Sequence, residues 1–182
     1  MNKLKLYVIR HGETNVNVKN LVNSRNMIGL NKKGKEQALK AGKEIAKLDI
    51  DLIICSPLRR TVQTCKLINV NRVKVIYDRR LMERNARSMQ FKKVELIDFD
   101  IWYDRDKEII YKDTEGFKSV VKRVGNVIEE IKLKYKYKNK NILLVTHGDV
   151  CKAIYSYING ITDINIIRAH KYPNCHITEY EL

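Results

Sequence analysis

The sequence has little proline and no long apolar segment. Only two prolines, Pro57 and Pro173, occur in 182 residues, and no repeat, low-complexity linker or Pro/Gly-rich hinge divides the chain. A chain of this length with 44% hydrophobic residues can bury roughly two-thirds of its unfolded surface. No apolar run approaches the roughly 18 residues of a membrane-spanning helix. We therefore expect a single domain over residues 1–182 and no membrane association.

Cysteine and histidine lack the spacings that are typical of metal sites and disulfide frameworks. The four cysteines contain no CxxC pair, and the four histidines contain no HxxxH pair. Reduced thiols suit a cytosolic protein. The N-terminal residues MNKLKLYVIRH resemble the charged front of a signal peptide, but the apolar stretch 6–9 is too short for its hydrophobic region. We expect a cytoplasmic protein without a metal site.

The net charge of +15 is compatible with an anionic substrate or with nucleic acid. However, the 24 Lys, 22 Ile and 16 Asn are together the residues that AT-rich codons encode, so the charge reflects composition. The lysines are spread over the chain apart from the run KLKYKYKNK at 132–140, which we interpret as a helix end and its exit loop. The charge therefore predicts no specific nucleic-acid partner.

Short apolar segments alternate with amphipathic ones along the chain. The expected strands are 4–9, 52–55, 73–77, 142–146 and 175–180, and the expected helices are 35–48, 57–67, 115–136 and 148–158. This alternation predicts an α/β fold, a three-layer sandwich with a mostly parallel central sheet and helices on both faces.

Polar side chains follow four of these strands. Arg10-His11-Gly12 comes after the first strand, and Ser56-Pro57-Leu58-Arg59-Arg60 comes after the second. Arg80-Leu81-Met82-Glu83-Arg84 lies just beyond the third, and His147-Gly148-Asp149 follows the fourth. Ligands of open α/β sheets bind beyond the carboxyl ends of the strands, so these side chains are expected at one edge of the sheet.

Two histidines, several arginines and a carboxylate form a set suited to phosphoryl transfer. Phosphate monoesters hydrolyse so slowly that enzymes supply up to about 10²¹-fold acceleration, which requires a nucleophile, a proton donor and several cations together. A neutral imidazole can attack phosphorus, and neighbouring arginines keep it unprotonated. The planar guanidinium group of arginine matches phosphate oxygens two at a time.

Four segments, in order along the chain, resemble the motifs of one family. RHGET at 10–14 is similar to the signature of the histidine phosphatase superfamily, also called the phosphoglycerate-mutase-like family. CSPLRRTVQT at 55–64 is similar to its S-x-L-x-R-A-x-x-T segment. LMER at 81–84 and VTHGDV at 145–150 resemble its glutamate and second-histidine segments, and the ending NCHITEYEL resembles its last strand.

The resemblance implies a role for six residues. His11 is the expected nucleophile that becomes phosphohistidine, and Glu83 is expected to protonate the leaving oxygen and then activate water. The expected phosphate-binding residues are Arg10, Asn17, Arg60 and His147. The resemblance implies no metal and no organic cofactor. The implied activity is that of a histidine acid phosphatase-type phosphoric monoester hydrolase acting on a small phosphorylated substrate.

Each of these assignments has an alternative. Arg59 competes with Arg60 for the phosphate pocket, and the family spacing favours Arg60. Glu83 can instead be an ordinary acid paired with a neighbouring arginine, and His147 a structural residue at a strand end. His170 and His176 are interpreted as structural or exposed. Glu13 is expected to support the turn or the following helix rather than to catalyse.

Two segments depart from the family pattern. Relatives often have R-x-Q-G-x-x-D-x-P-L-T after the nucleophile loop, whereas LVNSRNMIGLN stands at 21–31, with Leu21, Ser24 and Met27 in place of the arginine, glycine and aspartate. After Glu83 the sequence RNARSMQ at 84–90 replaces a small glycine-containing segment. Because these segments are expected to frame the leaving group, the sequence leaves the substrate open.

The length of the insertion separates the possible functions. Glu83 and His147 are 64 positions apart, and we expect a helical lid at about 84–138. A 2,3-bisphosphoglycerate-dependent phosphoglycerate mutase has a longer insertion there, so a phosphatase is favoured over a mutase. The alternative of another class is a non-catalytic module that binds anions or nucleic acid. The sequence does not indicate an oligomeric state.

Overall fold

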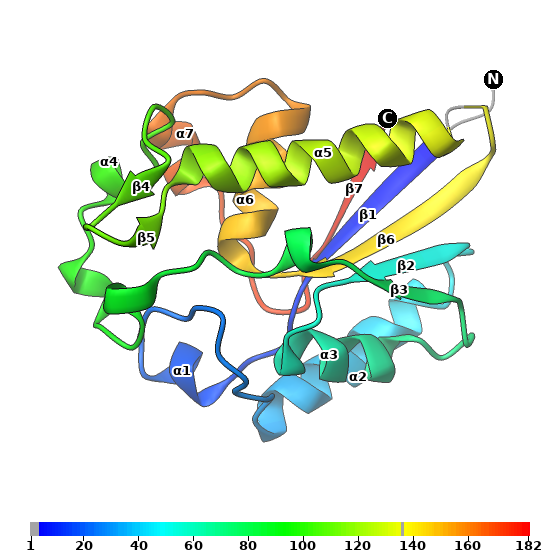
Figure 1. Cartoon of the computed structure of the whole chain (residues 1–182). Coiled ribbons are helices and arrows are strands. Elements are labelled where there is room, and N and C mark those ends of the chain that lie inside the picture. The colour runs from blue at the N-terminus through cyan, green and yellow to red at the C-terminus, as the bar shows by residue number, and fades with distance from the viewer. Residues whose placement is uncertain (1–3, 136) are drawn as a thin grey trace.

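The centre of the computed structural model, which describes residues 4–135 and 137–182, is a five-stranded sheet of order β3-β2-β6-β1-β7 (Figure 1). Four strands run parallel, and β7 is antiparallel to β1 at one edge. The strands are β1 (Leu4–Arg10), β2 (Leu52–Cys55), β3 (Val75–Tyr77), β6 (Lys140–Thr146) and β7 (Ile177–Glu181). This confirms the predicted α/β fold. Two parts of the sequence analysis lie outside the described residues. They are residues 1–3, the start of the segment compared with a signal peptide, and Lys136, the predicted end of a helix.

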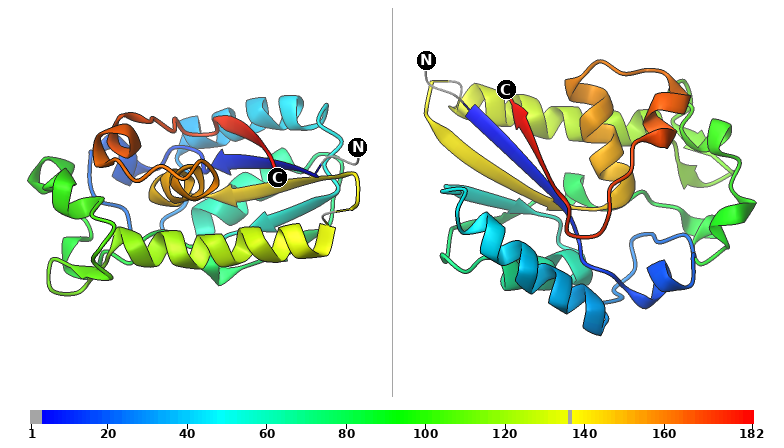
Figure 2. Two further views of the ribbon diagram at one scale, coloured as in Figure 1. Left: turned by 90° about the horizontal axis from the view of Figure 1, so that it is seen from above. Right: turned by 180° about the vertical axis from the view of Figure 1, so that it is seen from behind.

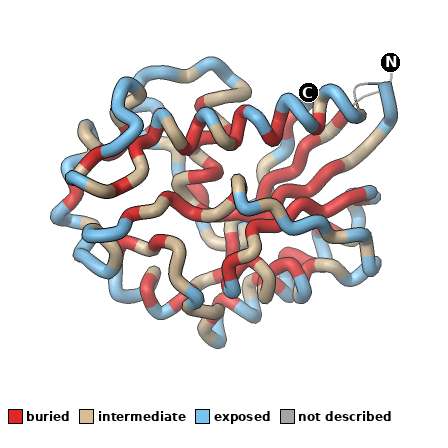
Figure 3. The backbone as a smooth tube through the Cα atoms, viewed as in Figure 1, coloured by how far each residue is buried: buried red, intermediate tan, exposed pale blue. Residues whose placement is uncertain are grey.

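Helices cover both faces of this sheet, as the edge-on view shows (Figure 2). The alternation of side chains along β1 sends Leu6 and Val8 into one apolar cluster and Tyr7 and Ile9 into the other. Residues of α5 (Phe117–Tyr135) and α6 (Gly148–Ile158) complete the first cluster. Residues of α2 (Lys32–Ile45) and α3 (Arg59–Ile68) complete the second. The buried residues therefore lie along the central strands β1, β2 and β6 and on the inner faces of the helices (Figure 3).

Local hydrogen bonds set the element boundaries and shift some of them from the predicted ones. α2 begins three residues earlier than predicted because the Asn31 side chain accepts a hydrogen bond from the Gly34 N–H and caps the helix. β3 begins at Val75 because the Asn69 side chain bonds both backbone groups of Val73 and holds that residue in a turn. β7 begins at Ile177 because Cys175 has a positive φ of 57°.

The insertion predicted as a helical lid at about 84–138 consists of two different parts. Its second part is α5, which packs against the sheet as one of the core layers. Its first part, up to residue 116, is mostly irregular. It contains only elements of two to four residues, which are too short to form a packing layer. They are η2 (Arg87–Met89), η3 (Val94–Leu96), α4 (Phe99–Trp102), β4 (Ile109–Ile110) and β5 (Thr114–Glu115). The short helices α1 (Asn15–Val18) and α7 (Ile164–Ala169) were also not predicted.

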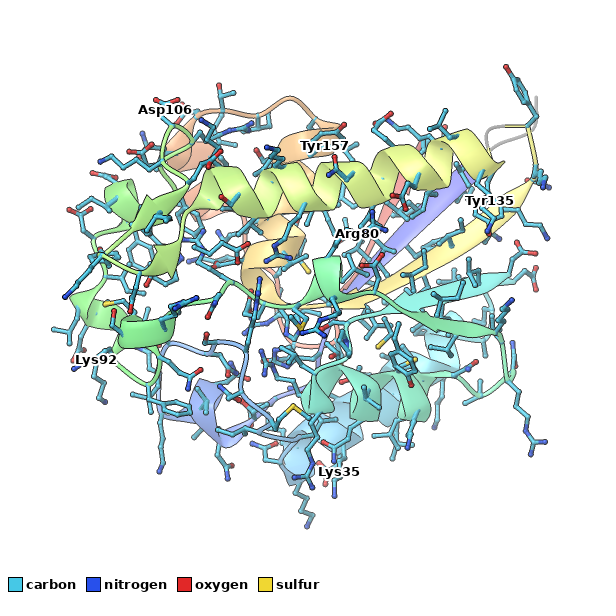
Figure 4. The ribbon with its side chains drawn as sticks, viewed as in Figure 1. Lys35, Arg80, Lys92, Asp106, Tyr135 and Tyr157 are labelled. Carbon is cyan, nitrogen blue, oxygen red and sulfur yellow. The ribbon has the colours of Figure 1, made fainter. Side chains whose placement is uncertain are left out.

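The segment between β3 and Glu83 is tied to α5 by arginine side chains. It contains the 3-10 helix η1 (Arg79–Leu81). Arg80 reaches Glu130 of α5 at 2.6 Å and Asp78 at 2.7 Å (Figure 4). Arg123 of α5 donates to the carbonyl oxygen of Arg80. These contacts hold the chain just before Glu83 against a core helix. No helix within residues 4–135 and 137–182 is long and apolar enough to cross a membrane.

Candidate active site

His11 stands at the carboxyl end of β1, where the chain leaves the sheet. Its backbone N–H donates to Thr146 of β6, so the parallel ladder continues by one residue, and Asn174 donates to its carbonyl oxygen at 2.7 Å. The next residue, Gly12, packs so closely on the start of α2 that a Cβ there would lie 2.3 Å from the Gly34 oxygen. The Thr64 hydroxyl accepts the Gly12 N–H at 3.0 Å. The backbone around His11 is therefore rigidly held.

The hydrogen bonds of the His11 ring define its tautomer. Nδ1 lies 2.7 Å from the carbonyl oxygen of Gly12, which can only accept, so Nδ1 carries the proton. Arg60 donates from Nε to Nε2 of His11 at 3.2 Å, which requires a lone pair on Nε2. Burial lowers the pKa of His11 well below its usual value, and the charges of Arg60 and Arg10 add to this effect. The ring is therefore neutral, with Nε2 as its nucleophilic atom.

Arg60 is completely buried at the start of α3. Besides its bond to His11, it donates from Nη2 to the carbonyl oxygen of Ser24 at 2.9 Å and from Nη1 to that of Asn26 at 3.2 Å. Burial lowers its pKa to about 10, so the guanidinium stays charged at neutral pH. Arg59 is exposed. Of the two candidates, the structure places Arg60 beside His11.

His147 and Arg10 bring two further nitrogen groups to the same edge. The His147 ring meets the His11 ring edge to face, with 5.2 Å between centroids, and its Nε2 shares a hydrogen bond of 2.7 Å with the Ser56 hydroxyl. Arg10 donates from Nη1 to the Tyr172 carbonyl oxygen at 2.7 Å. Within the described residues, Nδ1 of His147 and Nε of Arg10 are buried without a hydrogen-bond partner. Arg10 Nε is a donor, and His147 Nδ1 is a second one in the tautomer in which Nε2 accepts the Ser56 hydroxyl proton, so both are suited to bind an anion beside the nucleophile.

Glu83 is the buried carboxyl group of the site, with only 7% of its surface exposed. Its Oε1 accepts the backbone N–H of Arg84 at 3.0 Å. Burial and, to a lesser extent, the nearby Asp149 carboxylate raise its pKa to about 7, against the opposing effects of Arg60, the Arg84 N–H and Arg10. A carboxyl group with such a pKa holds a proton for a substantial fraction of the time at neutral pH, as a general acid must.

Asp149 lines the same cavity as Glu83 and belongs to a polar network that the sequence patterns did not predict. Its carboxylate accepts from Trp102 Nε1 at 2.9 Å and from the Tyr103 hydroxyl at 3.1 Å, and lies 3.1 Å from Arg84 Nε. Arg84 is fully buried and stacks over the Trp102 ring at 4.4 Å. The only sequence signal for this network was the position of Asp149 directly after the His147-Gly148 pair. The residues that contact Asp149 come from the first part of the insertion. The hydrophobic pattern of that segment does not predict how it folds.

Asn17 lines the cavity in front of the site and also caps α1. Its Oδ1 accepts from the backbone N–H and the hydroxyl of Thr14, which leaves the two N–H groups of the amide as the donors it can offer a ligand. Glu13 accepts from Asn31, the residue that caps α2, at 3.0 Å. Glu13 thus supports the following helix, in agreement with the prediction from the sequence.

The divergent segment at 21–31 holds the site together. The Ser24 hydroxyl accepts the Ala86 N–H at 2.9 Å, while its carbonyl oxygen receives Arg60. Arg25 donates to the Glu83 carbonyl oxygen at 2.9 Å and forms an ion pair with Glu115 at 3.0 Å. The serine that replaces the family's glycine therefore links Arg60 to the insertion.

All six predicted site residues lie at the carboxyl edge of the parallel sheet. His11 contacts two of the others directly, through a hydrogen bond from Arg60 and a ring contact with His147. An adjoining cavity of about 720 Å³ is lined by Arg10, Asn17 and Glu83. His170, set aside in the sequence analysis, also lines this cavity, stacked on Tyr155 at 4.1 Å. His176 is exposed. No group of three or more metal-ligating side chains occurs in the part of the chain that the structure describes.

Comparison with known proteins gives a single family. A family model described as "Histidine phosphatase superfamily (branch 1)" matches residues 6–182. Phosphoserine phosphatase 1 of Hydrogenobacter thermophilus is 26% identical over 165 residues, which are 87% of this chain and 77% of that protein. Agropine synthesis reductase of Rhizobium rhizogenes is 31% identical over 160 residues. That match takes in 82% of this chain, which spans only about a third (34%) of the reductase.

A solved structure gives the same fold. Mycobacterial glucosyl-3-phosphoglycerate phosphatase, in complex with VO3, has a TM-score of 0.84 at 22% identity. The alignment covers 96% of this chain and 90% of that one. At this level of identity the likeness establishes the three-layer fold and leaves the chemistry to the side chains described above.

Proposed function

This chain belongs to branch 1 of the histidine phosphatase superfamily, and we propose that it is a phosphomonoesterase that hydrolyses a small phosphorylated metabolite through a phosphohistidine on His11. The observation that carries the proposal is the unprotonated Nε2 of a buried, neutral His11 beside the guanidinium of Arg60. Arg10, Asn17 and His147 supply further donors for the phosphate oxygens. A relative named as a phosphatase supports hydrolysis.

The reaction proceeds in two displacements. Nε2 of His11 attacks phosphorus, the ester P–O bond breaks, and Glu83 gives its proton to the leaving oxygen. The Glu83 carboxylate then takes a proton from water, whose oxygen attacks the phosphohistidine. Inorganic phosphate leaves, and His11 and protonated Glu83 are restored. Arg10, Arg60 and His147 stabilise the charge that develops on the phosphoryl oxygens in both steps.

The phosphoenzyme is the direct test of this proposal. On incubation with an aryl phosphate we expect release of inorganic phosphate and, after quenching in base, a phosphoryl group on the peptide that contains His11, identified by mass spectrometry. The His11→Asn protein is the control and acquires no label. A phosphoryl group found elsewhere, or no release from any phosphomonoester, would contradict the proposal. Transfer between phosphoglycerates that outpaces release of phosphate would identify a mutase instead.

The pH profile tests the acid phosphatase-type subclass. We expect kcat/KM for an alkyl phosphate to fall as the pH rises through about 7, because Glu83, whose pKa burial raises to about 7, loses the proton it must donate. Activity persists on the acid side because burial and the charges of Arg60 and Arg10 keep the pKa of His11 well below 6.5. The optimum therefore lies on the acid side of neutrality.

A good leaving group provides the control for this profile. The p-nitrophenolate ion departs without prior protonation, so the falling limb is expected to be shallower with p-nitrophenyl phosphate than with an alkyl phosphate. Glu83→Gln is expected to remove the limb for both substrates. A wild-type rate on alkyl phosphates that rises through pH 7 would show that Glu83 is not the acid.

A further inference from the structure

One wall of the cavity beside the phosphate site is basic. Lys152 comes from α6, Arg168 from α7 and Lys171 from the segment that leads to β7, and all three line the same cavity as Arg10. Across residues 4–135 and 137–182, none of the three forms an ion pair with a carboxylate. Three cations from separate elements thus converge on one cavity, and the carboxylates that share its lining, Glu13, Glu83 and Asp149, form no ion pair with them among the described residues.

Lys152 is the most constrained of the three. Its ammonium donates to the carbonyl oxygens of Ile167 and Arg168, at 2.5 and 3.0 Å, in the last turn of α7. An ammonium has three N–H groups, so one donor is left for a ligand. Burial lowers the pKa of Lys152 to about 8, and repulsion by Lys171 and Arg10 acts in the same direction against the attraction of Asp149. A bound anion would relieve this repulsion.

Aromatic rings contact two of the three cations without neutralising them. The Lys152 ammonium lies 5.0 Å from the centre of the Tyr103 ring, and the Arg168 guanidinium lies 5.0 Å from that of Phe99. The nearest acid, Asp149, is already bonded to Arg84 and to two aromatic donors. The Asp149 carboxylate therefore mainly balances the charge of Arg84. The wall formed by Lys152, Arg168 and Lys171 keeps an excess of positive charge.

We propose that Lys152, Arg168 and Lys171 form a second anion subsite and that the substrate is a small phosphomonoester with a second anionic group, a carboxylate or a phosphate, in the part that leaves. This inference rests on the proposed function, since it takes the ester phosphate to be bound by Arg10 and its neighbours. Arg10 and the three basic residues line the same cavity, so the two subsites share it, and its volume of about 720 Å³ fits a metabolite rather than a macromolecule.

The test compares substrates with and without a second anionic group. 3-Phosphoglycerate and glycerol 3-phosphate share a carbon chain but carry a carboxylate and a hydroxymethyl group, respectively. Fructose 1,6-bisphosphate and fructose 6-phosphate make the same comparison for a second phosphate. We expect kcat/KM to favour the doubly anionic member of at least one pair by about 10-fold or more, as one charge-assisted hydrogen bond provides. The pair that shows the preference identifies the anionic group.

The Arg168→Gln/Lys171→Gln protein is expected to lose most of this preference. The matched control is Lys40→Gln/Lys43→Gln, which removes the same charge from exposed positions on α2 and is expected to keep the preference. If the preference survives in the first protein, or falls equally in both, the subsite assignment is wrong and general electrostatic attraction explains the preference.

Failure of this inference is distinguishable from failure of the proposed function. Hydrolysis of p-nitrophenyl phosphate with no preference within either pair would overturn the second subsite and leave the phosphatase proposal intact. If no phosphomonoester is hydrolysed, the subsite is still decided by calorimetric titration of the same four compounds into the His11→Ala protein. A Kd that differs by less than twofold within both pairs would then overturn it.

Discussion

Replacement of His11 by alanine is expected to lower kcat for an aryl phosphate by at least about 10⁴-fold, because the attacking atom itself is removed and no neighbouring group replaces it. The ring of His147 lies 5.2 Å away by centroid, and its Nε2 is engaged by Ser56. It therefore has no free nucleophilic atom in the position of Nε2 of His11. The measurement is phosphate release under saturating substrate.

His176→Ala is the matched control, since this histidine is exposed and outside the cavity lining. It is expected to retain wild-type kcat within about twofold, in line with other exposed substitutions. Thermal unfolding checks that His11→Ala remains folded. If the folded His11→Ala protein keeps more than a tenth of the wild-type rate, His11 is not the nucleophile.

Replacement of Arg60 by lysine is expected to lower kcat/KM by about 10²–10³-fold although the charge is kept. The guanidinium reaches three acceptors from three of its nitrogens: Nε2 of His11 and the carbonyl oxygens of Ser24 and Asn26. A lysine ammonium presents one compact charge and cannot hold the 24–26 loop, orient His11 and bind a phosphate oxygen together. Steady-state kinetics with an aryl phosphate measures this loss.

Arg59→Lys makes the same chemical change one residue away, at an exposed position, and is expected to leave kcat/KM unchanged within about twofold. Because Arg60 is buried, the Arg60→Lys protein is also examined by thermal unfolding and by binding of inorganic phosphate. Equal losses in the two variants would show that position 60 has no special part in binding the phosphoryl group. A folded Arg60→Lys protein with wild-type kinetics would do the same.

Local sequence patterns were sufficient to predict the sheet and its covering helices. Apolar runs such as 52–55 and 142–146 have no polar face and are too short for a helix, so they predict strands buried on both sides. The polar residues after each run then follow at one edge, because parallel strands end together. For the same reason Arg10, His11, Arg60 and His147 could be placed together before any contact was known.

The polar network around Asp149 could not be predicted in this way. Arg84 reads as one more surface cation among 36 basic residues, yet it is buried against Trp102 and paired with Asp149. The first part of the insertion, up to residue 116, has no helical or alternating period, because its residues pack on the site rather than on a regular layer. Within the segment expected as a helical lid at about 84–138, the only long helix that the structure describes is therefore α5.

The sequence by itself determined the family, the α/β fold and the identity of the groups placed at the sheet edge, since these depend on residue type and on the order of strands. Only the tertiary structure decided between Arg59 and Arg60, assigned the lone pair of His11 to Nε2, and raised the pKa of Glu83. It also brought Lys152, Arg168 and Lys171 to one wall of a cavity. Burial and long-range contacts produce these properties, and neither is encoded by the spacing of residues along the chain.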